Sequence, residues 1–113
     1  MSYGWKITWS NPSIFDDGES IGTIGPSDIH PDILEILQND LYNNHPYVHD
    51  LDNNHPYVNR FDMYDDDGIR YFAGVLIGDN VDGDEPLYDY GTPYAGATEI
   101  VTVFSGKEER YYA

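Results

Sequence analysis

The chain has no cysteine and very few basic residues. Without cysteine it can form neither a disulfide nor a thiolate metal site, and the lack fits a reducing compartment. Five Lys and Arg residues stand against 21 Asp and Glu residues, which gives a formal net charge of −16 on 113 residues. Because nucleic-acid binding needs Lys and Arg to displace counterions, we expect no direct contact with DNA or RNA. An anionic membrane surface would repel the chain as well.

Long hydrophobic runs are also missing. The longest one, near Phe72 to Ile77, is far shorter than the roughly 18 residues that a membrane helix needs. The segment from Met1 to Asn11 has one Lys and no apolar stretch, so it does not resemble a signal peptide. These absences predict a cytoplasmic protein.

Aromatic residues are abundant and argue for a folded chain. Low hydrophobicity with high net charge is typical of disorder. Here, however, 11 Tyr, four Phe and two Trp supply large apolar surfaces and favour strands. The length suits one domain, so we predict a single acidic domain over residues 1–113.

Periodicity predicts the elements of an α+β fold. Residues 3–9 alternate as a strand, and residues 57–64 and 69–77 form a hairpin around the Asp-Gly turn at 65–68. A helix begins near Ser27, carries apolar residues at steps of four and ends near Asn43, with Ser27 or His30 as its N-cap and Pro31 in its first turn. Residues 98–104 form a further strand. We expect an antiparallel sheet of about four strands with one helix packed on a face.

Other segments are less regular. Residues 21–24 could form a short strand, residues 110–113 could pair as an edge strand, and residues 86–97 read as irregular. Residues 43–48 recur as residues 53–58, each copy reading Asn-Asn-His-Pro-Tyr-Val. Two copies at a period of ten residues do not make a repeat protein, so we interpret them as a duplication that lengthens a loop over 43–58.

Several short motifs carry a resemblance to a known group. They are Trp5-Lys6-Ile7-Thr8, Gly22-Thr23-Ile24-Gly25-Pro26, the Arg60 to Gly68 stretch, Tyr71-Phe72-Ala73-Gly74 and the Pro86 to Ile100 stretch. Together they resemble small uncharacterised acidic proteins of actinobacteria and their phages, over most of the chain except the duplicated segment. The resemblance implies a bacterial or phage cytosolic protein. It supplies no functional residues, because no activity is attached to that group.

Metal and catalytic sites are weakly supported. Counting back from Gly68 or Gly83 places Met63 or Gly78 at the first calcium-ligand position, so neither acidic turn fits an EF-hand loop. His45, His49 and His55 could hold zinc with nearby carboxylates, but their spacing matches no closed site. No nucleophile motif or phosphate-binding loop is present, so we expect no cofactor and no enzymatic activity.

The acidic surface is the main functional signal. Duplex DNA carries one charge per roughly 1.7 Å, so sixteen net charges match the phosphates of about eight base pairs. This favours a phage-type inhibitor that mimics DNA charge and blocks a basic, nucleic-acid-binding host protein, as anti-CRISPR, anti-restriction or transcription-inhibiting proteins do. Two alternatives are a virion or assembly component with tyrosine-rich loops, and an ordinary domain adapted to high salt. The predicted partner-binding residues are Asp16, Asp17, Glu19, Tyr64, Asp65, Asp66, Asp67, Asp79, Asp82, Asp84, Glu85, Tyr88, Asp89, Tyr90 and Tyr94.

Overall fold

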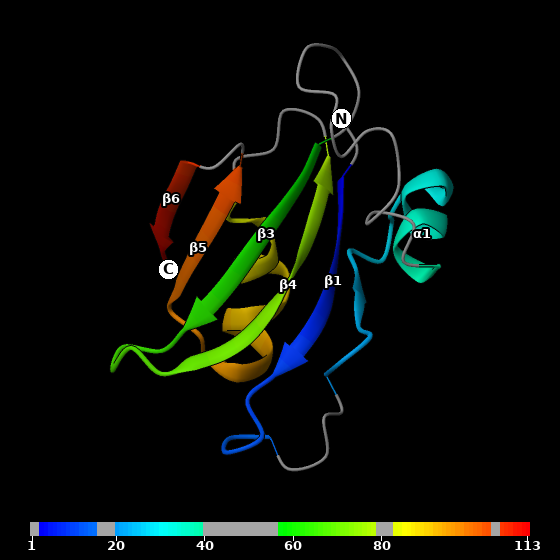
Figure 1. Ribbon diagram of the computed structural model, residues 1–113. Helices are drawn as coiled ribbons and strands as arrows, with labels where there is room; N and C mark the ends of the chain where they lie inside the picture. The colour runs from blue at the N-terminus through cyan, green and yellow to red at the C-terminus, as the bar shows by residue number, and fades with distance from the viewer. Residues whose placement is uncertain (1–2, 16–19, 40–56, 79–82, 105–106) are drawn as a thin grey trace.

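The fold is an antiparallel sheet with short helices, which confirms the predicted α+β class (Figure 1). The computed structural model describes residues 3–15, 20–39, 57–78, 83–104 and 107–113. Within these ranges the strands form one sheet in the order β2-β1-β4-β3-β5-β6, and every paired strand is antiparallel. The elements are β1 (Tyr3–Ser10), β2 (Ile24–Gly25), α1 (Pro31–Gln38), β3 (Tyr57–Tyr64), β4 (Arg70–Gly78), the π-helix η3 (Leu87–Ala95), β5 (Glu99–Phe104) and β6 (Lys107–Tyr112).

The prediction of about four strands and one helix is wrong in number. The described residues contain six strands and two short helices. The possible strands at residues 21–24 and 110–113 correspond in part to β2 and β6, whose bounds differ because β2 has only two residues and β6 reads Lys-Glu-Glu-Arg-Tyr-Tyr without apolar alternation. Residues 86–97 were expected to be irregular because of Pro93 and two glycines, yet most of them form η3. Neither helix in these ranges is long and apolar enough to span a membrane.

The central hairpin forms as predicted. Asp65 closes the turn between β3 and β4: its backbone N–H donates to the carbonyl of Ile69 over 3.0 Å. Its carboxylate Oδ1 accepts from the N–H groups of Asp67 and Ile69 over 2.9 and 2.8 Å. Gly68 takes the left-handed conformation with φ of 79°, which residues with a side chain rarely adopt. The carboxylate of Asp65 therefore stabilises the hairpin turn itself.

The main core lies between the sheet and η3, the gold coil behind the strands in Figure 1. Successive residues of a strand face opposite sides, so Leu76 faces η3 while Val75 and Ile77 face away from it. Buried residues of this core are Trp5, Ile7, Phe61, Met63, Phe72, Leu76, Leu87, Ala97 and Ile100. Gly91 lets η3 approach the sheet closely, because a Cβ there would overlap the sulfur of Met63.

Helix α1 covers part of the opposite face, beside β1 and β2 (Figure 1). His30 is the N-cap, as one of the two predicted alternatives, and its Nδ1 accepts from the N–H of Asp32 over 3.2 Å. Ile33 and Leu37 of the predicted stripe are buried against Val75 and Ile77. The helix is shorter than predicted: it begins at Pro31 rather than near Ser27 and ends at Gln38.

Candidate functional site: an acidic hollow beside the β3–β4 turn

Three of the predicted aspartates line a hollow of about 730 Å³ at one end of the sheet. It lies between the β3–β4 turn, the start of β5 and the end of β6. Its lining residues are Asp65, Asp66, Asp67, Gly68, Thr98, Glu99, Tyr112 and Ala113. Four carboxylates surround the hollow, and only Glu99 among them is paired with an arginine, Arg110, in the described part of the chain. The three aspartates therefore leave a local negative potential, which suits a cationic side chain better than an anion or an apolar group.

The carboxylates of the turn differ in what holds them. Asp65 is committed to the turn, and the Asp66 carboxylate accepts from the hydroxyl of Thr98 over 2.9 Å. Asp67 is exposed. Burial and then the charge of Asp65 raise the pKa of the nearby Tyr71 phenol, so that phenol stays protonated beside the turn. Asp66 and Asp67 are both exposed, whereas Asp65 is half-buried. They are the carboxylates of the turn that are best placed to meet a partner.

Glu99 and Tyr112 belong to the hollow although the sequence did not single them out. They stand opposite each other across the β5–β6 pair. The Glu99 side chain, 14% exposed, lies 3.3 Å from Nη1 of Arg110. The alternation of residues 98–104 indicates a strand, but it does not reveal which turn the start of that strand meets. Glu99 reaches the aspartates only because β5 pairs with β3, where Tyr64 is its partner.

Of the four predicted tyrosines, two are largely exposed and two are half-buried. Tyr88 and Tyr94 are 55% and 54% exposed, and Tyr112 is 64% exposed. The Tyr88 hydroxyl donates to the carbonyl of Tyr112 over 3.3 Å, which places it close to the hollow. Tyr90 is half-buried: its ring lies 5.3 Å from that of Trp5, and its hydroxyl donates to Ser20 over 2.9 Å. Tyr64 is also half-buried and does not line the hollow.

Three predicted acidic residues have roles within the fold. The carbonyl of Asp84 accepts from the N–H of Leu87 at the start of η3. The Glu85 carboxylate accepts from the N–H of Gly83 over 2.9 Å. Asp89 is exposed but accepts two side-chain hydrogen bonds, which tie η3 to β1.

The other predicted residues lie in segments outside those that the structure describes. Asp16, Asp17, Glu19, Asp79 and Asp82 lie outside the described residues, and so do His45, His49 and His55 with most of the 43–58 duplication. Among the residues that are described, no group of three or more His, Cys, Asp or Glu side chains could hold a metal ion.

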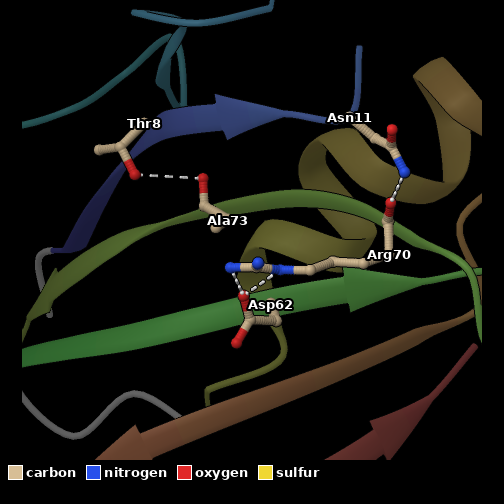
Figure 2. A network of polar contacts seen from close by, with 5 residues as sticks. All are labelled: Thr8, Asn11, Asp62, Arg70 and Ala73. Atoms are coloured by element: carbon tan, nitrogen blue, oxygen red, sulfur yellow. Dashed lines mark hydrogen bonds and ion pairs between the residues drawn. The ribbon is translucent and has the colours of Figure 1, made fainter. Parts of the chain in front are cut away.

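Four basic residues gather on the sheet face that η3 does not cover, which the sequence did not predict: Lys6, Arg60, Arg70 and Arg110. Arg60, Asp62, Arg70 and Ala73 line a second hollow of about 350 Å³ on this face. Figure 2 shows the guanidinium of Arg70 on one oxygen of Asp62, with contacts of 2.7 Å from Nε and 2.5 Å from Nη2. The same guanidinium lies 4.5 Å from the ring centre of Trp9. Lys6 donates to the carbonyl of Leu37 over 3.0 Å, where a cation stabilises the end of α1.

Ion pairs hold two of these arginines, and one of the pairs involves Glu99, which also lines the hollow beside the turn. Arg70 is paired with Asp62, and Arg110 with Glu99. The Asn11 amide and the Thr8 hydroxyl also donate to carbonyls of β4 (Figure 2). The polar groups drawn there bond to one another and fix the sheet.

Comparison with known proteins gave no match: no protein-family model, no curated protein and no solved structure matches the chain.

Proposed function

We propose that this protein is a non-enzymatic acidic interaction domain that binds a basic protein partner. The partner is a nucleic-acid-binding protein of the host, and the domain occupies its basic groove in place of DNA, as a phage-type inhibitor in the host cytoplasm. Anti-CRISPR, anti-restriction and transcription-inhibiting activities are the forms that such blocking takes. The observation that carries the proposal is the hollow lined by Asp65, Asp66, Asp67 and Glu99 in a chain of net charge −16.

The negative charge and the exposed aromatic rings would contribute to binding in different ways. Negative potential speeds the encounter with a basic surface and makes association sensitive to salt. Tyr88 and Tyr112, next to the hollow, supply apolar contact area of the kind enriched at interface hot spots. A partner arginine entering the hollow could meet a carboxylate and an aromatic ring at once, a combination that suits its planar guanidinium.

The proposal is tested by reversing charge at the hollow. Asp66→Lys with Asp67→Lys changes the net charge by +4, and so does the control pair Asp28→Lys with Glu35→Lys, which lies on exposed positions near α1. Capture of the partner from a bacterial lysate should be lost with the first pair and retained with the second. Circular dichroism and urea unfolding report whether each variant is folded, and Asp67→Lys alone spares the Thr98 hydrogen bond.

Equal loss of capture with both pairs would show that total charge, and not the hollow, decides binding. Unchanged capture with the Asp66 and Asp67 variants would move the site to another part of the chain. Either result contradicts the proposed site.

A second candidate is a virion or assembly component, which the exposed rings of Tyr88, Tyr94 and Tyr112 favour. In that case aromatic contacts join subunits, and the charge only keeps the free subunit in solution. Sedimentation velocity separates the two: large assemblies that disappear when these three tyrosines become serine support the structural role, and a small species in both proteins contradicts it.

A further inference from the structure

Strand β6 forms one edge of the sheet. In the described part of the chain it pairs with β5 alone, in a register that joins Glu99 to Tyr112 and Val103 to Glu108. The N–H of Ala113 donates to the carbonyl of Thr98 over 2.9 Å, which continues that ladder by one residue. An edge strand presents backbone groups that can pair with another chain.

Backbone direction identifies which groups point outward. Alternate residues of an antiparallel strand turn their N–H and C=O groups to opposite sides. Because Ala113 turns toward β5, Tyr112, Arg110 and Glu108 turn theirs away from it. The carbonyl of Tyr112 agrees with this, since it accepts from the Tyr88 hydroxyl rather than from β5. Glu108 and Arg110 remain as a short outward template.

The charges along this template complement those of a second copy. Glu108 and Arg110 are exposed, and they lie on the same sheet face because their β5 partners are Val103 and Val101. In an antiparallel pair of β6 strands with Glu109 at the two-fold axis, each Glu108 stands opposite Arg110 of the other copy. The two-fold axis produces this attractive pair twice, and opposite charges in such pairs stabilise a sheet, whereas the single Glu109 pair at the axis brings like charges together and opposes the pairing.

We infer that β6 is a dimerisation edge, at which β6 of a second copy pairs antiparallel in this register. Outward N–H and C=O groups of Glu108 bond to those of Arg110 across the axis, which extends the sheet through both chains. The exposed rings of Tyr88 and Tyr112 flank the edge and add apolar contact. Two chains of net charge −16 repel each other, so the dimer strengthens as salt screens that repulsion. The dimer therefore responds to salt in the opposite direction to the binding of the proposed basic partner.

Cysteine substitution tests the register. Because the native chain has no cysteine, each single-cysteine variant carries one thiol. In the dimer, two residues at position 109 face each other with Cα atoms about 4.5–5.5 Å apart, within disulfide range. The two residues at position 108 are offset along the strands, which places their Cα atoms roughly 8 Å apart, and the same holds for position 110. Both distances are beyond disulfide range. Mild oxidation of Glu109→Cys should therefore give a covalent dimer at least about tenfold faster than Glu108→Cys or Arg110→Cys. Equal rates in all three, or no dimer with Glu109→Cys, would overturn the inference.

Charge exchange supplies a second test without a covalent bond. Sedimentation equilibrium at about 500 mM salt, where the screening length is a few ångströms, should show a dimer of the native chain. Arg110→Glu should raise its dissociation constant about tenfold, since two attractive cross-strand pairs become repulsive. Glu108→Arg combined with Arg110→Glu should restore it to within about threefold of native, although the Arg110–Glu99 contact is lost in both variants.

A double variant no tighter than Arg110→Glu would contradict the paired register. A native chain that stays monomeric at every concentration and salt would contradict the dimer itself. If the chain is monomeric and the β6 variants also lose partner capture, the result would indicate that a strand of the partner, and not a second copy, pairs with β6.

Discussion

The indole N–H of Trp5 donates to Oδ2 of Asp89 over 2.9 Å, and this bond joins the first strand to the π-helix 84 residues later in the chain. The Tyr3 hydroxyl donates to the same oxygen over 2.7 Å. Trp5 is 3% exposed, so its N–H depends on this partner. An aspartate that the sequence suggests for partner binding is thus bonded within the fold.

Removing the Asp89 carboxylate should destabilise the domain. Asp89→Ala leaves the indole N–H and the Tyr3 hydroxyl without their acceptor, which we expect to lower the free energy of unfolding by about 1–3 kcal/mol. Urea unfolding followed by tryptophan fluorescence measures the loss. Asp67→Ala is the matched control, because Asp67 lies exposed in the turn, and it should change the stability by less than about 0.5 kcal/mol. Equal effects would contradict the role given to Asp89.

Alkaline pH should weaken the fold through Tyr3. Burial and then the hydrogen bond to Asp89 raise the pKa of the Tyr3 phenol above its ordinary value. Below about pH 10 both folded and unfolded chains hold this proton, and the contribution of Tyr3 to stability is complete. Above that pH the unfolded chain releases the proton first, so the free energy of unfolding falls. Urea unfolding at a series of alkaline pH values should show a shallower fall for Tyr3→Phe, and an identical fall would contradict this assignment.

The close approach of η3 to the sheet should make Gly91 intolerant of a side chain. Gly91→Ala places a Cβ against the sulfur of the fully buried Met63, and we expect it to lower the free energy of unfolding by about 1–3 kcal/mol. Met63→Ala alone opens a cavity and should lower it by about 2–5 kcal/mol. Because the new methyl group enters the space that Met63 leaves, the double variant should lose less than the sum. Strict additivity in urea unfolding would contradict this packing.

The sequence predicted the sheet better than it predicted the helices. Alternation and an Asp-Gly turn are local signals, so β1 and the β3–β4 hairpin could be found from residues near one another. The π-helix was missed because Pro93 and Gly91 disfavour a regular helix, and its stability comes from packing on β3 and β4. The edge strand suggested at residues 110–113 is confirmed in part: β6 begins earlier, at Lys107, because pairing with β5 holds its charged first half in the sheet.

The candidate site was predicted in part for the same reason. Asp65, Asp66 and Asp67 are adjacent in sequence and share the hollow. Glu99 and Tyr112 join them through strand pairing over more than thirty residues, which no local pattern encodes. Composition also gave no hint that Arg60, Arg70 and Arg110 share one face, because position in a strand, rather than frequency, sets that arrangement.

The most direct test of partner binding is capture of basic proteins from a bacterial lysate on the immobilised domain, at about 50 mM and about 500 mM salt, where screening lengths differ severalfold. Duplex DNA is then added to the captured fraction. We predict that one nucleic-acid-binding protein is retained at low salt, released at high salt and displaced by the DNA, because both ligands occupy one basic groove. Capture that is unchanged by salt and by DNA would contradict the account.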